Sequence, residues 1–253
     1  MIDINKIYLG DCLDVMKFIG DKSIDMILCD LPYGITQNKW DTIIPFKDLW
    51  YFYERIIKDN GAIVLFGQDK FSAKLMLSNE KIHRYNLIWD KQLTSGFLNA
   101  NKMPLRCHED IIVFYKQLPI YNPQKIKGNK NHSKGKMQTE ISNNNYSKYK
   151  RVDMGEILGD MKHPKSIISF SKPHPSKCLH PTQKPIELCE WLIQTYTNEE
   201  DLILDNCIGS GTTAIAAINT NRRWIGIEKD EKYFETANKR IEEHYKTMKK
   251  KLF

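Results

Sequence analysis

Short apolar runs alternate with amphipathic stretches over the first 116 residues. Residues 24–29 and 62–66 are apolar runs of strand length, and residues 87–89 and 111–115 are further candidate strands. Between the first two runs, residues 45–59 carry apolar side chains at helical spacing and end before Asn60-Gly61, a helix-stop signal. Strands that alternate with helices predict a parallel sheet covered on both faces.

The periodicity fades over residues 117–177, where Lys, Asn, Ser, Gly and Pro dominate. Order returns after residue 180 with a helical pattern from residue 186, a strand at 202–204, a glycine loop, a helix at 212–219, a strand at 224–227 and a charged final helix. We therefore expect one α/β domain made of residues 1–116 and 179–253. Residues 117–178 form an insertion into it.

The excess positive charge lies in this insertion. The formal net charge is +7, and residues 116–177 hold thirteen Lys and Arg against four Asp and Glu. A solvated basic loop and a polyanion-binding insertion both fit such a cluster, because lysines on phosphates gain affinity by releasing counterions. Composition alone does not choose between them.

The remaining composition excludes several classes of protein. No apolar run reaches the roughly 20 residues that a membrane span requires, and the first residues lack the regions of a signal peptide, so we expect a cytoplasmic location. The six cysteines form no C-x-x-C pair. This spacing predicts reduced thiols and no metal.

A glycine loop follows the strand at 202–204 and opens the next helix. It reads Asp205-Asn206-Cys207-Ile208-Gly209-Ser210-Gly211-Thr212-Thr213, and the following strand ends in Glu228, an acidic residue able to hold ribose hydroxyls. It has neither the Gly-Lys-Ser/Thr of a phosphate loop nor the full three-glycine dinucleotide motif. Structural turns with this spacing are common, but the combination favours an adenosine cofactor without pyrophosphate, as S-adenosylmethionine is.

The tetrapeptide Asp30-Leu31-Pro32-Tyr33 follows the strand at 24–29 and so belongs at the carboxyl edge of the sheet. An isolated D-x-P-Y would be a strand-ending turn. Methylation of a base amine would give these residues distinct roles. Asp30 accepts one amine N–H, the carbonyl of the Leu31–Pro32 region accepts the other, and Tyr33 offers a face for a base flipped out of the duplex.

Taken together, these motifs resemble the amino-methyltransferases of DNA. Besides the tetrapeptide and the glycine loop, His180-Pro181-Thr182-Gln183-Lys184-Pro185 and the opening Tyr8-Leu9-Gly10-Asp11-Cys12 match that family. The tetrapeptide precedes the cofactor loop, as in the circularly permuted β group. The resemblance covers residues 1–116 and 179–246.

The resemblance implies a Rossmann-like S-adenosylmethionine-dependent fold, a mostly parallel sheet with helices on both faces, and a target-recognition region at 117–178. It implies Asp11 near the cofactor adenine, and His180, Thr182 and Lys184 near the methionine end. It also implies sequence-specific binding of double-stranded DNA, with a homodimer and a separately encoded restriction endonuclease as further partners. The complete expected cofactor set is Asp11, Cys12, Asp30, His180, Thr182, Lys184, Asp205, Cys207, Gly209, Ser210, Gly211, Thr212 and Glu228.

Two departures from the family pattern keep alternatives open. Leu31 stands where proline is usual, and Asn206-Cys207 stands where Pro-Phe is usual. They motivate the alternative of a DNA-binding protein that binds cofactor without catalysis. The initial Asp30 favours adenine N6 over cytosine N4, because enzymes of the latter type more often begin the tetrapeptide with serine. Lys91 and residues 106–109 are candidates to flank the flipped base, or to have only a surface or core role.

Overall fold

The computed structural model describes residues 2–36, 38, 41–129, 141–143, 146–149, 160–172 and 183–251. The chain divides into two compact units, residues 1–122 with 166–253, and residues 123–165. In the smaller unit, β6 (Ile126–Lys127) pairs with β9 (Met161–Lys162), and β7 (Ile141–Asn143) pairs with β8 (Tyr146–Tyr149). The larger unit holds the main sheet.

This sheet has eight strands in the order β1-β12-β11-β2-β3-β5-β4-β10. Its members are β1 (Lys6–Leu9), β2 (Ile24–Cys29), β3 (Ile57–Gly67), β4 (His83–Ser95), β5 (Arg106–Phe114), β10 (Ile167–Ser169), β11 (Leu202–Asp205) and β12 (Arg223–Glu228). Each neighbouring pair is parallel except β3–β5 and β5–β4. The predicted Rossmann-like, mostly parallel sheet is confirmed. Strand β5 runs the other way because it forms a hairpin with β4.

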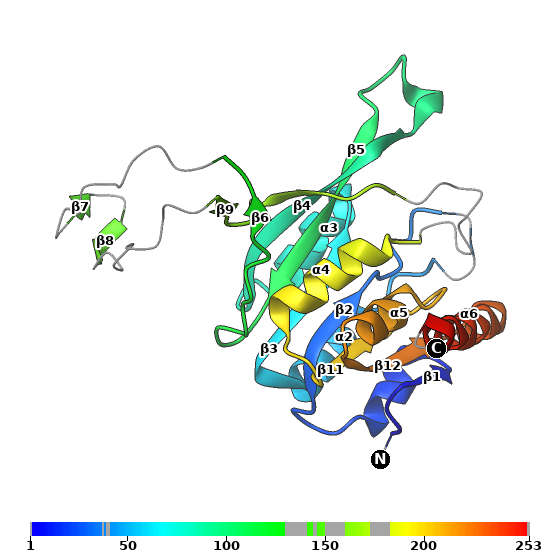
Figure 1. Cartoon of the computed structure of the whole chain (residues 1–253). Helices are drawn as coiled ribbons and strands as arrows, with labels where there is room; N and C mark the ends of the chain where they lie inside the picture. Colours follow the sequence, from blue (N-terminus) through cyan, green and yellow to red (C-terminus); the bar gives the residue numbers. More distant parts are fainter. Residues whose placement is uncertain are drawn as a thin grey trace. The chain divides into compact units, whose positions relative to one another are not determined.

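Helices cover both faces of the sheet (Figure 1). Successive residues of β2 point to opposite faces, so Met26 and Leu28 pack in one apolar cluster while Ile27 and Cys29 pack in another. The first cluster includes α4 (Ile186–Tyr196), α5 (Thr212–Asn219) and α6 (Glu231–Lys251). The second includes α1 (Cys12–Val15), the 3-10 turn η1 (Met16–Phe18), α2 (Phe46–Ile56) and α3 (Asp69–Ser78).

One edge of the sheet collects the polar residues. Strands β1, β12, β11, β2 and β4 run in the same direction, so the residues that follow them meet at their common carboxyl edge. The antiparallel β5 begins at that same edge. The tetrapeptide after β2, the glycine loop after β11 and Glu228 at the end of β12 are thereby brought together.

Some elements differ from the expectation. The helix expected at 45–59 ends at Ile56, because the chain enters β3 at Ile57. Residues 167–169, expected in the insertion, pair with β4 in the main sheet; three residues are too few to show a strand periodicity. Within the described residues, no helix combines the length and apolarity needed to cross a bilayer.

Candidate active site

The glycine loop turns sharply between β11 and α5. Gly209 and Gly211 have φ values of 52° and 83°, in the left-handed region that favours glycine. A Cβ on Gly211 would lie 3.3 Å from Ile241 Cδ1, so α6 packs closely against the turn. Asp205, the last residue of β11, stabilises the loop because its Oδ1 accepts a hydrogen bond from the Cys207 N–H at 3.1 Å. Burial raises the pKa of Asp205 to about 6.

Glu228 connects the end of β12 to this loop. Its Oε2 accepts the N–H of Gly209 at 2.8 Å, and its Oε1 accepts the N–H groups of Lys229 and Asp230 at 2.9 and 2.8 Å. Burial raises the pKa of Glu228 despite these bonds. The carboxylate therefore lies where the loop, the strand end and the first turn of α6 converge.

Asp11 lies beside the same strand end. Its Oδ1 accepts the Leu13 N–H at 3.0 Å and caps α1, while its Oδ2 lies 3.0 Å from Lys229 Nζ. Burial opposes ionisation of Asp11, but the hydrogen bonds from Lys229 and the Leu13 N–H, together with the positive charges of Lys229 and Lys17, leave the pKa of Asp11 below its usual value. Asp11 is thus an ionised carboxylate that lines the cavity beside the end of β12.

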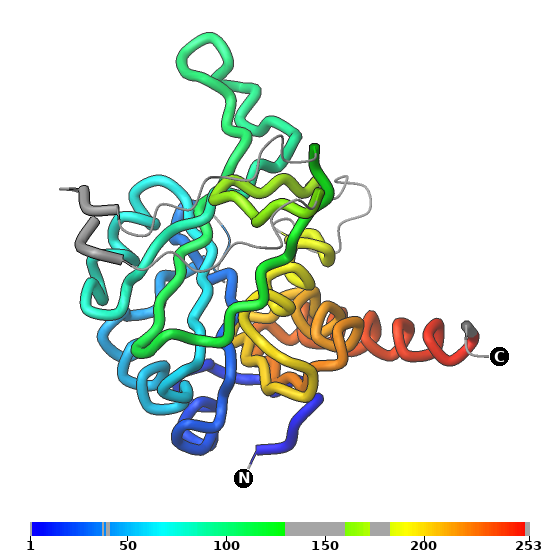
Figure 2. The backbone as a smooth tube through the Cα atoms, turned by 60° about the vertical axis from the view of Figure 1, so that its left-hand side comes forward, coloured from blue at the N-terminus to red at the C-terminus, as the bar shows by residue number. Residues whose placement is uncertain are grey.

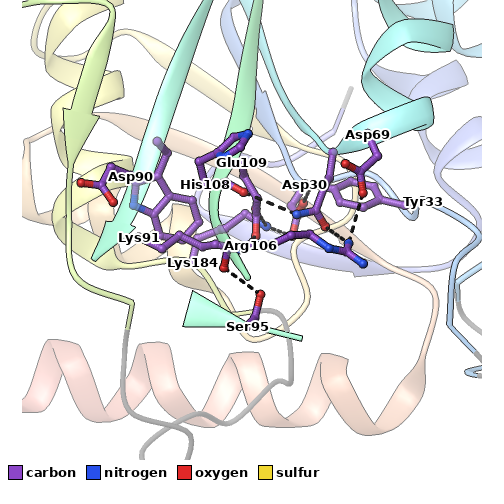
Figure 3. A network of polar contacts seen from close by, with 12 residues as sticks. Asp30, Tyr33, Asp69, Asp90, Lys91, Ser95, Arg106, His108, Glu109 and Lys184 are labelled. Carbon is purple, nitrogen blue, oxygen red and sulfur yellow. Dashed lines mark hydrogen bonds and ion pairs between the residues drawn. The ribbon is translucent and has the colours of Figure 1, made fainter. Parts of the chain in front are cut away.

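The side chains of the tetrapeptide Asp30-Leu31-Pro32-Tyr33 have different surroundings. Asp30 Oδ1 accepts the Tyr33 hydroxyl at 2.8 Å, and Asp30 Oδ2 lies 2.5 Å from Lys184 Nζ (Figure 3). One face of the Tyr33 ring stacks on Phe71, with centroids 4.6 Å apart. Leu31 is 3% exposed and packs in the core. The departure from the family pattern at Leu31 therefore concerns packing.

A buried network of four charged side chains extends from Asp30. Lys184 Nζ lies 3.2 Å from Glu109 Oε2, and Lys91 Nζ lies 3.1 Å from Glu109 Oε1. The Lys184, Glu109 and Lys91 side chains are 8%, 14% and 4% exposed. The carboxylates of Asp30 and Glu109 thus balance the ammonium groups of Lys184 and Lys91. This pairing offsets part of the free-energy cost of removing the charges from water.

The pKa directions follow from this balance. Burial raises the pKa of Asp30 more than the attraction of Lys184 lowers it, and repulsion from Glu109 adds to the rise. Burial also opposes ionisation of Glu109, but Lys184 and Lys91 leave the pKa of Glu109 below its usual value. Burial alone would lower the pKa of Lys184, but Asp30 and Glu109 raise it above its usual range. Lys184 is therefore a permanent cation between the two carboxyls.

A single cavity of about 610 Å³ joins the glycine loop to the tetrapeptide. This volume is in the usual range of small-molecule sites, roughly 300–1,000 Å³. It is lined by all four tetrapeptide residues and by Asp11, Cys12, Glu109, Lys184, Asp205, Cys207, Gly209, Ser210, Thr212 and Glu228. The carboxylates of Asp11 and Glu228 and the bare backbone at Gly209 suit an adenosine group. Because Asp30 lines the same cavity, a bound cofactor and a target base would be neighbours.

One expected cofactor residue packs outside the cavity, and two others are not among the residues that the structure describes. Gly211 does not line the cavity and packs against α6 instead. His180 and Thr182 lie outside the described residues. The position of Lys184 at the methionine end of the cofactor stays a prediction; the structure adds its contact with Asp30. No group of three His, Cys, Asp or Glu able to hold a metal occurs in the part of the chain that the structure describes.

Lys91 and Glu109 are the residues whose placement the sequence left open. Lys91 precedes and Glu109 follows the turn of one hairpin, and Lys184 comes from a segment 154 residues after Asp30 in the chain. Neither residue stands out locally, because Lys91 lies between Asp90 and Gln92 and Glu109 lies between His108 and Asp110. Burial of both ends of the pair distinguishes them from ordinary surface charges.

The family model and the relatives that this chain matches are DNA methyltransferases. A family model of N6/N4 methyltransferases, described as DNA methylase, matches residues 24–239. The Type II methyltransferase M2.MboI of Moraxella bovis is 29% identical, over 94% of this chain and 87% of the relative. The DNA adenine methyltransferase YhdJ of Escherichia coli (strain K12) is 26% identical, over 93% of this chain and 83% of the relative.

A solved structure is also similar along nearly the whole chain. The crystal structure of the M1.HpyAVI–SAM complex superimposes with a TM-score of 0.62 at 26% sequence identity. The match covers 93% of this chain and 98% of that one.

Proposed function

Because the chain belongs to the N6/N4 DNA methylase family, we propose that it transfers a methyl group from S-adenosylmethionine to N6 of an adenine in DNA. The observation that carries this proposal is the cavity shared by Asp30 and the glycine loop, in which a cofactor and a base can meet. YhdJ, named as a DNA adenine methyltransferase, supports adenine as the target.

The cofactor half of the cavity is proposed to hold S-adenosylmethionine, which supplies a sulfonium methyl group when bound. Glu228 accepts a hydrogen bond from a ribose hydroxyl at the acceptor site that remains on Oε2, and Asp11 contacts the adenine end. Asp205, Cys207, Ser210 and Thr212 border the loop side of the cofactor. Asp205 is ionised at neutral pH, since its pKa is about 6, and attracts the positive charge of the cofactor.

Asp30 is proposed to be the catalytic carboxylate. The amine lone pair of a base is delocalised into the ring, and hydrogen bonds that make the nitrogen more tetrahedral direct it at the methyl group. Each carboxylate oxygen has two lone-pair sites. Tyr33 uses one site on Oδ1 and Lys184 one on Oδ2, so a site on each oxygen remains for an amine N–H. The nitrogen forms a bond to the methyl carbon as the carbon–sulfur bond breaks, and then releases one proton, for which Asp30 is the adjacent acceptor.

Lys184 and Glu109 are proposed to be positioning residues for Asp30. Lys184 fixes the orientation of the carboxylate and opposes the rise that burial causes in the pKa of Asp30. Glu109 holds Lys184 in turn, and Lys91 holds Glu109. Glu109 lines the same cavity as Asp30.

The target base must leave the duplex to reach Asp30. Phe71 stacks on one face of Tyr33, and Lys184 Nζ lies 6.0 Å from the centroid of the same ring. We propose that the flipped base stacks on the part of the ring that Phe71 does not cover. Such stacking contributes about 1–3 kcal/mol per base. Pro32 fixes the local φ and holds the neighbouring carbonyl as a second acceptor for the amine.

We also propose that the basic segment 117–178 recognises the target sequence. Its lysines would contact phosphates, which fix register, while its polar side chains read base edges. The order of tetrapeptide, insertion and cofactor loop supports membership of the permuted β group. A homodimer and a separately encoded restriction endonuclease remain proposed partners.

The test compares Asp30→Asn with the wild type in incorporation of a tritiated methyl group into unmethylated plasmid DNA. We expect the variant to lose roughly 100-fold or more in rate while calorimetry shows an unchanged dissociation constant for S-adenosylmethionine. Unchanged methyl transfer in the variant would refute the assignment of Asp30. Cofactor binding by the wild type without turnover on any DNA would favour the noncatalytic DNA-binding alternative.

Mass spectrometry of the digested product identifies the modified base. N6-methyladenine supports the proposal, whereas N4-methylcytosine would establish the cytosine alternative. Long-read sequencing of a plasmid carrying the gene in a methylation-free host reveals the recognition sequence at the same time.

A further inference from the structure

The β4–β5 hairpin extends beyond the sheet at the edge that holds the active site. Figures 1 and 2 both show it projecting past the neighbouring strands. Strand β4 is parallel to β2, so the hairpin leaves the same carboxyl edge from which Asp30 follows β2. Lys91 and Glu109 of the charged network lie at its root. The hairpin is therefore fixed to the catalytic machinery.

The base and the tip of the hairpin are both held by hydrogen bonds. At the base, Arg106 binds Asp69 Oδ2 at 3.1 Å and Gln68 Oε1 at 3.2 Å. At the tip, the N–H of Asn99 donates to the Gly96 carbonyl at 2.9 Å, and the N–H of Met103 donates to the Asn99 carbonyl at 3.0 Å. The tip is a folded turn that includes the 3-10 turn η2 (Phe97–Asn99).

The tip presents large apolar side chains to solvent. Phe97 is 80% exposed and Leu98 is 96% exposed, and Leu93 and Met103 are about half exposed at 49% and 48%. Residues 91–107 contain no Asp or Glu, and Lys102 adds a positive charge at the tip. An apolar tip without acidic residues suits insertion next to a phosphate backbone.

The reach of the hairpin fits a nucleic-acid groove. Phe97 comes six residues after Lys91, and a strand rises about 3.3 Å per residue, so the tip lies up to roughly 20 Å beyond the root. Grooves of B-form DNA are roughly 8 Å deep. A duplex lying across the catalytic edge would thus be reached through its groove.

We propose that Phe97 and Leu98 form an apolar wedge that enters the DNA stack and occupies the gap left by the flipped base. This inference rests on the proposed function. Apolar side chains that insert between base steps are an established means of opening a duplex. Filling the gap stabilises the flipped state, because the neighbouring bases regain an apolar contact that they lose when the target leaves.

The test uses Phe97→Ala/Leu98→Ala and, as a matched control, Leu77→Ala. Leu77 is 67% exposed and lies near the C-terminal end of α3, outside the hairpin, the cavity and the segment 117–178. Each protein is assayed on two oligonucleotide duplexes that carry the site methylated by the wild type. In one duplex the target base is paired, and in the other it faces a mismatch, which lowers the cost of flipping.

We expect the double variant to lose roughly tenfold or more in kcat/KM on the paired duplex and to recover most of this loss on the mismatched one. When 2-aminopurine replaces the target base, binding of the double variant should raise the fluorescence of 2-aminopurine less than binding of the wild type does. The control variant should match the wild type on both duplexes, and all three proteins should bind S-adenosylmethionine equally.

Equal activity of the double variant and the wild type on the paired duplex would overturn the proposed wedge role of Phe97 and Leu98 but leave the proposed function intact. Equal losses on both duplexes, together with a change of oligomeric state in sedimentation, would also overturn it and assign the tip to contact with a second copy of the chain. A wild-type protein that methylates no DNA would instead refute the proposed function.

Discussion

Replacement of Lys184 by methionine should destabilise the protein strongly, because it leaves Asp30 buried beside Glu109 without its cation. Lys184 Nζ lies 2.5 Å from Asp30 Oδ2, and the lysine side chain is 8% exposed. Removal of one partner from a buried ion pair costs about 3–5 kcal/mol. For a chain of this size that corresponds to a decrease of roughly 6–20 °C in Tm, measured by circular dichroism.

The pH dependence of this loss provides a second measurement. Without Lys184, burial raises the pKa of Asp30 still further above its unfolded value. A carboxyl with a raised folded-state pKa does not reduce stability below its unfolded pKa, and its cost grows as pH rises between the two values. The stability difference between variant and wild type should therefore narrow from about pH 7.5 to about pH 5.

Two further variants separate charge from packing. Lys17→Met removes an ion pair with Asp14 whose side chains are 58% and 72% exposed, so its effect should stay below about 1 kcal/mol. Adding Asp30→Asn to Lys184→Met removes the uncompensated carboxylate and should restore part of the lost stability without restoring methyl transfer. A loss below about 1 kcal/mol for Lys184→Met, or a difference that widens on acidification, would refute the reasoning.

Three shorter predictions concern the cofactor loop and the tetrapeptide. Protonation of Asp205, whose pKa is about 6, should raise the calorimetric Kd for S-adenosylmethionine by up to roughly tenfold per pH unit below that value, and Asp205→Asn should remove this pH dependence. Glu228→Gln should raise the same Kd by roughly 10–100-fold, because hydrogen bonds to a charged group contribute about 1.5–3 kcal/mol; an unchanged Kd would exclude Glu228 from the ribose site. Leu31→Ala should lower the free energy of unfolding by about 2–5 kcal/mol yet leave kcat within roughly twofold at a temperature where it is folded. A stable Leu31 variant without activity would contradict the packing role.

Local sequence determined the elements that carry the main motifs. The apolar run of β2 followed by Asp30, and the strand, glycine loop and helix from Leu202 onward, could be predicted because each motif is contiguous in the chain. Propensity, side-chain periodicity and glycine geometry act over a few residues. The family resemblance rested on the same contiguous motifs and their order.

Only the tertiary structure decided which charges meet. Lys184 lies 154 residues from Asp30, and Lys91 and Glu109 reach the same network through the β4–β5 hairpin. No local pattern reports such contacts, since charge pairing between distant segments depends on how the strands order in the sheet. The reversed direction of β5 and the addition of β10 to the sheet edge likewise arise from pairing with β4. Sequence therefore predicts the chemical groups at each strand end, while the strand order determines which of them share a cavity.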